Sequence, residues 1–330
     1  MGLLTLALMV TISCGTGTVT TDQTTVSTIS STFAASSTSS TTSTVQQSTS
    51  TSGPPASTLP TNPLGLLTTT GVPVAILESR PLGYQVLTPC GNEMVIEDGV
   101  AFGTTTVVID PGHGGPVDTG AVASTGVAER EINLLVAQAV EQLLLEQGIS
   151  AVLTRSGDYA SPLNVRAQLA DSLDAEVMVS IHHNSPSPGP SPIPGVEVFI
   201  QANSSSSRRL GGLLWKRSMQ ALDVFDVVWV AADDAGVMTV LNSRGDDAYG
   251  IIRHPQTPTA LIELGYISNL AEAELHQDPM YVAVAAGAIA QAISEYLQSD
   301  SQGSGFIEGR VFDPEPGVGQ DVCTDPDLGR

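Results

Sequence analysis

Four residues of this chain have side chains suited to metal-assisted chemistry. They are His113 in VVIDPGHGG, Glu129 in GVAEREINL, His182 in SIHHNS and Glu263 in ALIELGYISN. Imidazole nitrogen and carboxylate oxygen are preferred ligands of Zn²⁺, and a catalytic zinc keeps one position open for water. Bound zinc lowers the pKa of that water to about 7 and polarises a carbonyl group. A carboxylate that does not bind the metal can then take the water's proton and return it to a leaving nitrogen.

Each of these residues also has an ordinary structural interpretation. His113 could simply form a hydrogen bond within its turn, and Glu129 could complement the positive end of a helix dipole. Glu263 is the one acidic residue in the apolar run TALIELGYI. A charge is costly there unless it has a partner or a function, so Glu263 could be the ion-pair partner of Arg155 or Arg166. The metal hypothesis therefore depends on whether the fold brings the four residues together.

The segments around these residues alternate between strand and helix patterns. Short apolar runs predict strands over residues 105–110, 150–154, 176–181, 195–200 and 259–264. Helical spacing predicts helices over Glu131–Gln147, Leu163–Leu173, Ser205–Leu222 and Met280–Leu297. This alternation indicates an α/β fold with a mostly parallel sheet flanked by helices on both faces. Since ligands gather at the carboxyl ends of such strands, His113, His182 and Glu263 are expected to converge at one edge, with Glu129 beside them.

Composition divides the chain into a signal, a linker, a short β-rich lead-in, a single catalytic domain and a tail, at residues 1–14, 15–70, 71–103, 104–298 and 299–330. More than half of residues 15–62 are Ser or Thr, and such a segment cannot bury enough apolar surface to order itself. We therefore expect a disordered linker there. The tail is rich in Gly, Pro and Asp and is expected to be irregular and acidic.

Charge and cysteine usage indicate the compartment. The chain has 12 Lys and Arg against 34 Asp and Glu, a net charge of −22, which argues against nucleic acid as a partner. The apolar start ending in Cys14 resembles a bacterial lipoprotein signal, so we expect an exported, extracytoplasmic monomer anchored in the membrane by a lipid on Cys14. Cys90 and Cys323 flank the catalytic domain, and in an oxidising compartment they could form a disulfide.

The motifs quoted above, together with VLTRSGD, occur in an order and spacing that resemble the zinc-dependent N-acetylmuramoyl-L-alanine amidases of bacterial cell walls, the amidase-3 family. The resemblance covers about residues 104–297. It implies cleavage of the amide between N-acetylmuramic acid and L-alanine in peptidoglycan. It also implies that His113, Glu129 and His182 bind Zn²⁺, and that Glu263 is the catalytic base and acid for a zinc-bound water.

Several features of this sequence leave questions for the structure. In relatives the position of His183 is usually a small residue, so this histidine could line the substrate groove or compete for metal. Asp110 could orient His113 or cap the turn, and Arg155 and Arg166 are expected to pair with carboxylates of the fold. We expect a site open to substrate. Two other functions use the same residues: an inactive wall-binding regulator of this fold, or a zinc peptidase acting on another amide.

Overall fold

The computed structural model describes residues 60–185, 195–227 and 236–300, with side chains up to residue 298. These residues belong to one compact unit, Ala56–Arg330, whereas a second unit, Met1–Pro55, lies outside them. The predicted signal with Cys14, most of the predicted linker and the predicted tail also lie outside the described residues. So does Cys323, one end of the expected disulfide.

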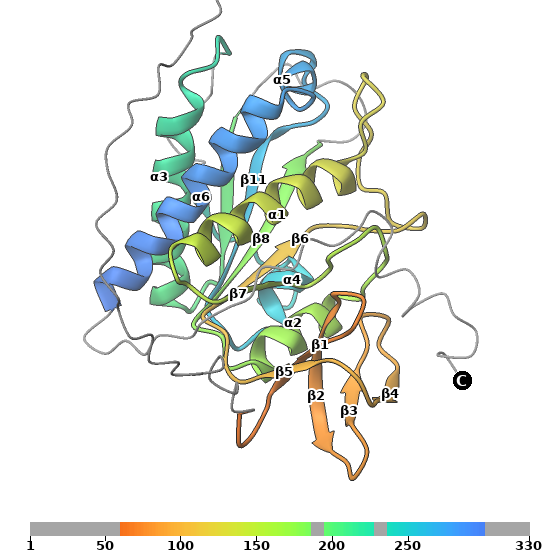
Figure 1. Ribbon diagram of the computed structural model, residues 1–330. Coiled ribbons are helices and arrows are strands. Elements are labelled where there is room, and N and C mark those ends of the chain that lie inside the picture. Colours follow the sequence, from red (N-terminus) through yellow and green to blue (C-terminus); the bar gives the residue numbers. More distant parts are fainter. Residues whose placement is uncertain (1–59, 186–194, 228–235, 301–330) are drawn as a thin grey trace, which may run out of the picture. The chain divides into compact units, whose positions relative to one another are not determined.

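The lead-in is an antiparallel sheet of five strands (orange in Figure 1). Its strands are β1 (Gly65–Leu67), β2 (Pro73–Ser79), β3 (Tyr84–Leu87), β4 (Glu93–Ile96) and β5 (Val100–Phe102). The order is β4-β3-β2-β1-β5, and every neighbouring pair is antiparallel. Strand β1 pairs with both β2 and β5, so this sheet begins ahead of the boundary expected at residue 71.

The central sheet has six strands in the order β10-β9-β11-β8-β6-β7. They are β6 (Val107–Pro111), β7 (Ala151–Leu153), β8 (Val177–Asn184), β9 (Glu197–Ile200), β10 (Val237–Met238) and β11 (Thr259–Tyr266). Strands β7, β6, β8 and β11 run parallel, but β9 pairs antiparallel with β11. The predicted α/β class is therefore confirmed, while the expectation of a mostly parallel sheet is corrected to one antiparallel sheet and one mixed sheet.

Helices cover both faces of the central sheet (Figure 1). The helices are α1 (Glu129–Glu146), α2 (Leu163–Ser172), α3 (Ser205–Leu222), α4 (Gly250–Arg253), α5 (Leu270–Leu275) and α6 (Pro279–Asp300). One face packs α1, α3 and α6 into the larger apolar core. The opposite face packs α2, α4 and part of the lead-in, where Ala75 of β2 joins Leu169 and Leu173 in one buried cluster.

The long helix α6 is apolar enough, over Pro279–Gln298, to cross a membrane by length and composition alone. More than half of that window (56%) is buried inside the fold, where α6 contacts α1 and α3. Since a core helix of a soluble domain passes the same test, we assign α6 to the core.

A buried ion pair fixes the end of β6. The carboxylate of Asp110 accepts hydrogen bonds from the Thr154 hydroxyl (2.5 Å), Arg166 Nη1 (2.9 Å) and the Ser180 hydroxyl (2.7 Å). Burial alone would raise the pKa of Asp110, but the charge of Arg166 and the two hydroxyls lower it below its usual value. Asp110 therefore ties three segments together behind the turn that carries His113.

Two buried arginines hold the backbone of that turn. Arg166 donates to the carbonyl oxygens of Pro111 (2.7 Å) and His113 (2.7 Å). Arg155 donates to the carbonyl oxygens of Pro111 (2.9 Å) and Gly112 (2.9 Å). The expected pairing with carboxylates thus holds for Arg166, which pairs with Asp110, whereas the hydrogen bonds of Arg155 are to main-chain carbonyls.

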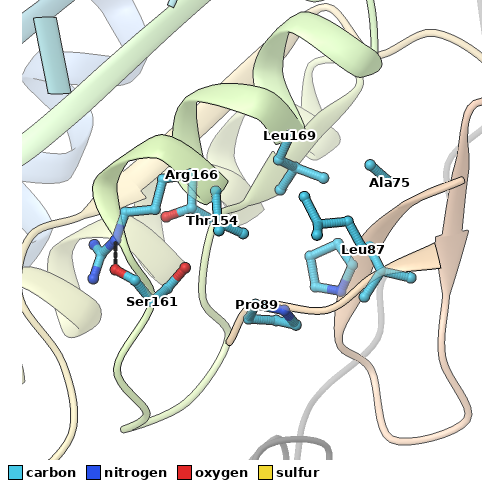
Figure 2. Close-up of a pocket in the computed structure, with 10 residues that line it drawn as sticks. Ala75, Leu87, Pro89, Thr154, Ser161, Arg166 and Leu169 are labelled. Carbon is cyan, nitrogen blue, oxygen red and sulfur yellow. Dashed lines mark hydrogen bonds between the residues drawn. The ribbon is translucent and has the colours of Figure 1, made fainter. Parts of the chain in front are cut away.

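Figure 2 shows a small pocket between the lead-in sheet and α2. It is lined mainly by apolar side chains and includes Arg166, which donates to the carbonyl oxygen of Ser161 (2.8 Å). None of the four chemistry-bearing residues lines it. We interpret this pocket as a gap in the packing between the lead-in sheet and α2, next to the side chain of Arg166.

The Asp110–Arg166 pair should be a large contributor to stability. Breaking a buried ion pair from one side leaves an uncompensated charge and costs about 3–5 kcal/mol. We therefore expect Asp110→Ala to lower the free energy of unfolding by that amount, measured by urea denaturation.

The matched control for this measurement is Glu295→Ala, which breaks the partly exposed Arg217–Glu295 pair. Exposed pairs contribute about 0–1 kcal/mol, so this variant should stay close to wild type. A loss of less than 1 kcal/mol in Asp110→Ala would contradict the role given to the buried pair.

Candidate metal centre

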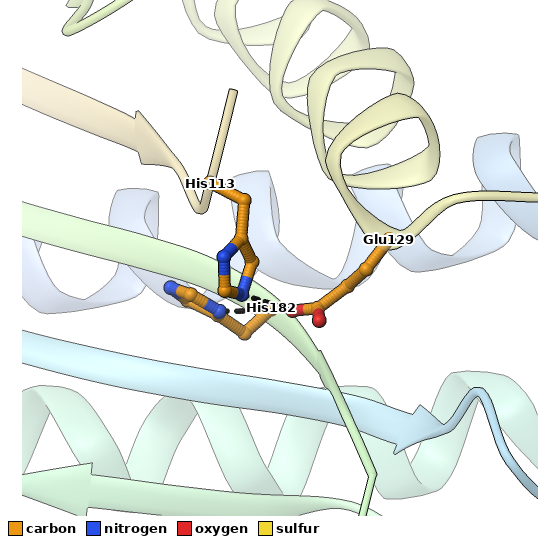
Figure 3. Close-up of side chains that lie close together, drawn as sticks. All are labelled: His113, Glu129 and His182. Carbon is orange, nitrogen blue, oxygen red and sulfur yellow. Dashed lines mark hydrogen bonds and ion pairs between the residues drawn. The ribbon is translucent and has the colours of Figure 1, made fainter. Parts of the chain in front are cut away.

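Three of the four residues singled out by sequence meet at one end of the central sheet (Figure 3). His113 follows β6, Glu129 is the first residue of α1, and His182 lies near the end of β8. One ligand atom from each lies within 4.8 Å of the others. The side chains of His113 and His182 are 26% and 16% exposed, whereas that of Glu129 is buried. The centre therefore has a buried carboxylate beneath two partly accessible imidazoles.

Glu129 stands between the two rings. Its Oε1 lies 3.1 Å from His113 Nε2 and 3.0 Å from His182 Nδ1, and its Oε2 accepts from the Ala121 amide at 3.0 Å. Burial alone would raise the pKa of Glu129, but the hydrogen bonds and charges of the two histidines outweigh burial and lower it far below its usual range. This carboxylate is therefore ionised at every physiological pH.

His113 is held in an unusual backbone conformation by its surroundings. Its φ is +62°, in the left-handed region that non-glycine residues seldom adopt. Its Nδ1 lies 2.6 Å from Asp118 Oδ1, which leaves Nε2 facing Glu129. Burial would lower the pKa of His113, but Glu129 and then Asp118 outweigh burial and raise that pKa above its ordinary value.

Asp118, and not Asp110, is the carboxylate that contacts the ring of His113. The structure assigns Asp110 to the Arg166 pair and places Asp118 on the ring of His113. The available signal was the acidic residue in the loop five positions after the histidine, HGGPVD. A carboxylate on the second nitrogen of a ligating histidine fixes its tautomer and its orientation.

Two glycines allow the side chains of the three candidate ligands to lie close together. A Cβ on Gly112 would lie 2.2 Å from the ring of His182, so any larger residue would displace that imidazole. Gly120 has φ +62°, and a Cβ there would lie 2.6 Å from Glu129 Oε2. The glycines of the turn after β6 and of the following loop therefore leave the space in which the three side chains meet.

Glu263 lies beside this cluster on the neighbouring strand. In the pairing of β11 with β8 it is opposite His182, and in the pairing of β11 with β9 it is opposite Glu197. It is only 9% exposed, and its Oε2 has no hydrogen-bond partner among the described residues. Burial, together with the negative charges of Glu129 and Glu197, raises its pKa well above the ordinary value.

The alternative interpretation of Glu263 as an ion-pair partner gains no support. The carboxylate that pairs with Arg166 is Asp110, and the hydrogen bonds of Arg155 go to main-chain carbonyls. Glu263 is thus a buried carboxyl group that is held next to the histidine cluster without a compensating cation within the described part of the chain.

The histidine that follows His182 turns its ring away from the three candidate ligands. His183 points to the opposite face of the sheet, where its ring contacts Asn133 and Tyr281. Burial lowers its pKa well below the ordinary value, so the ring is neutral. Two basic residues that precede β11 also lie outside the cluster: Arg253 donates to the main-chain carbonyl of Ala248, and His254 is exposed at the end of α4.

Known proteins are similar to this chain over the domain that carries the candidate metal centre. The sequence model of one family, described as N-acetylmuramoyl-L-alanine amidase, matches residues 107–295, which is more than half of the chain. The chain belongs to this amidase family, and the family and enzyme class that the sequence motifs predicted are confirmed.

The similar proteins include characterised and uncharacterised members. The chain is 35% identical to the uncharacterized protein YqiI of Bacillus subtilis, over 58% of this chain and 84% of that protein. It is 29% identical to the N-acetylmuramoyl-L-alanine amidase AmiA of Escherichia coli, over 59% of this chain and 77% of AmiA. Among solved structures, the amidase AmiC2 of Nostoc punctiforme is 30% identical, with a TM-score of 0.51, over 59% of this chain and 98% of that one.

The contact between Asp118 and His113 predicts a measurable pKa change. Asp118→Asn removes a negative charge from the imidazole, so the pKa of His113 should fall in chelator-treated protein. The measurement is an NMR titration of the imidazole nitrogens. Asp98→Asn, which changes an exposed carboxylate of the lead-in, should leave the titration of His113 unchanged. An identical His113 titration in Asp118→Asn and wild type would show that the 2.6 Å contact does not exist in solution.

Proposed function

We propose that this protein hydrolyses the amide bond between N-acetylmuramic acid and L-alanine in peptidoglycan, with Zn²⁺ bound by His113, Glu129 and His182. The observation that carries the proposal is the placement of Glu263 directly opposite His182, beside the three candidate ligands. Membership of the amidase family supports the same substrate.

The residues present fit a zinc ion. Two imidazoles and one carboxylate offer converging atoms within 4.8 Å, and Asp118 already holds the far nitrogen of His113. Two histidines and one glutamate form one of the ligand sets that catalytic zinc sites use, with a position left for water. When bound, zinc would activate a water molecule for attack and polarise the substrate carbonyl.

Glu263 would move the protons of the reaction. A carboxyl group of raised pKa holds a proton more readily than an ordinary glutamate, which suits a group that first accepts one and then donates it. We propose that Glu263 takes the proton of the attacking water and delivers it to the nitrogen of L-alanine. Protonation of that nitrogen allows the stem peptide to leave.

We propose that residues 1–14 direct export, that a lipid on Cys14 anchors the protein, and that the Ser- and Thr-rich segment links the anchor to the catalytic domain. The anchored monomer would then act on peptidoglycan near the membrane.

Replacement of Glu263 should separate catalysis from metal binding. Glu263→Gln keeps the shape of the side chain but removes the group that exchanges protons. We expect the rate of peptidoglycan digestion to fall on the order of 10²–10⁴-fold with one zinc per chain retained. Stem peptides that begin with L-alanine would be quantified by mass spectrometry.

The matched control is Glu97→Gln, an exposed glutamate of the lead-in, which should digest as fast as wild type. If Glu263→Gln also digests at the wild-type rate, Glu263 is not the catalytic carboxylate. If wild type releases no such peptides but binds zinc, the chain is an inactive wall-binding member of the fold or acts on another amide.

Replacement of His113 should remove the metal itself. His113→Ala deletes one of the three ligands, so the zinc content after dialysis should fall well below one per chain, measured by atomic emission. Digestion of peptidoglycan should fall in parallel. A zinc content that stays at one per chain in His113→Ala would exclude His113 as a ligand.

A further inference from the structure

A chain of buried polar groups connects helix α6 to the carboxylate of Glu129. Tyr281 Oη on α6 lies 3.0 Å from His183 Nε2, and His183 Nδ1 lies 2.7 Å from Asn133 Oδ1. Asn133 Nδ2 in turn donates to Glu129 Oε1 at 3.3 Å and to the carbonyl oxygen of Gly112 at 3.3 Å. The side chains of Asn133, His183 and Tyr281 are all buried, on the face of the sheet opposite Glu263.

Chemistry fixes the orientation of the Asn133 amide in this series of hydrogen bonds. The carbonyl of Gly112 and the carboxylate of Glu129 only accept, so the amide nitrogen of Asn133 must face them. The amide oxygen then faces His183, whose Nδ1 must carry a hydrogen. His183 Nε2 faces the Tyr281 hydroxyl at 3.0 Å, and this hydroxyl also donates to the carbonyl oxygen of Leu264 at 3.3 Å. A flip of the Asn133 amide would bring its oxygen against the acceptor oxygens of Gly112 and Glu129 and its nitrogen against the N–H of His183.

Packing holds the histidine of this chain in place. The ring of His183 meets the ring of His276 edge-on, with centroids 4.5 Å apart, and Tyr281 lies 4.9 Å from His276. The main-chain amide of His183 also donates to Glu129 Oε1 at 3.3 Å. His183 thus contacts the Glu129 carboxylate through its backbone and, by way of Asn133, through its side chain.

We propose that Tyr281, His183 and Asn133 act as positioning residues that orient the Glu129 carboxylate and thereby set the affinity of the site for Zn²⁺. This inference rests on the proposed function, since it takes Glu129 as a zinc ligand. We name these three residues the Asn133 relay. Residues that hydrogen-bond to metal ligands typically change metal affinity by about 10–100-fold when they are removed.

The test measures zinc affinity of the full chain by competition with a fluorescent chelator. Asn133→Ala should weaken zinc binding by about 10–100-fold. His183→Leu replaces the imidazole with an apolar side chain of similar size and removes both hydrogen bonds, so it should also weaken zinc binding. His183→Gln can still donate to Asn133 and form a hydrogen bond with Tyr281, so it should restore most of the affinity.

The hydroxyl of Tyr281 has its own matched pair of variants. Tyr281→Phe removes the hydrogen bond to His183 and should weaken zinc binding less than Asn133→Ala does. Tyr296→Phe makes the same change fifteen residues further along α6, about 22 Å away by helix geometry, and should leave zinc affinity unchanged. Unfolding temperatures of the metal-free variants identify any that fail to fold.

The outcomes separate this inference from the proposal on which it rests. If wild type binds zinc and folded Asn133→Ala, His183→Leu and Tyr281→Phe bind it equally tightly, the relay is wrong and the zinc site stands. If His183→Gln is as weak as His183→Leu, His183 acts by packing rather than by hydrogen bonding, and the inference is overturned. If wild type itself binds no zinc, the proposed function fails first.

Discussion

The constraint on which the site depends is the burial of the Glu129 carboxylate between two imidazoles. An ionised carboxylate taken out of water is costly unless it is paired and hydrogen-bonded. Here the partners come from three separate segments: His113 after β6, His182 on β8 and the amide of Ala121 in the loop before α1. The geometry of the whole catalytic end of the sheet must therefore be correct before this charge can be accommodated, and a divalent cation would complete its compensation.

Hydrogen bonds elsewhere in the fold hold the groups around Glu129 in this geometry. The Asp110–Arg166 pair and Arg155 hold the turn after β6 by its backbone carbonyls, so His113 keeps a left-handed conformation that it would not adopt freely. Parallel pairing of β11 with β8 then places Glu263 opposite His182. The turn that carries His113 is thus held by hydrogen bonds from two arginines that are themselves buried.

Much of this could be predicted from sequence, and the failures have physical causes. The alternation of strands with amphipathic helices placed α1 and α3 within two residues of their observed ends, and the carboxyl-end rule brought His113, His182 and Glu263 together. The sequence of β9 does not indicate its antiparallel direction, because a short run of buried residues has the same pattern in parallel and antiparallel strands. The short elements α4, α5 and β10 lack enough residues to show a period. Alternation along β8 does predict that adjacent His182 and His183 face opposite sides, and the structure places them so.

The central claim is that one Zn²⁺ is bound by His113, Glu129 and His182. It is tested most directly by diffraction from zinc-loaded crystals at the zinc absorption edge. We expect a single strong anomalous peak within bonding distance of one atom from each of these side chains. A peak at another site, with Glu129 still hydrogen-bonded to both imidazoles, would contradict it.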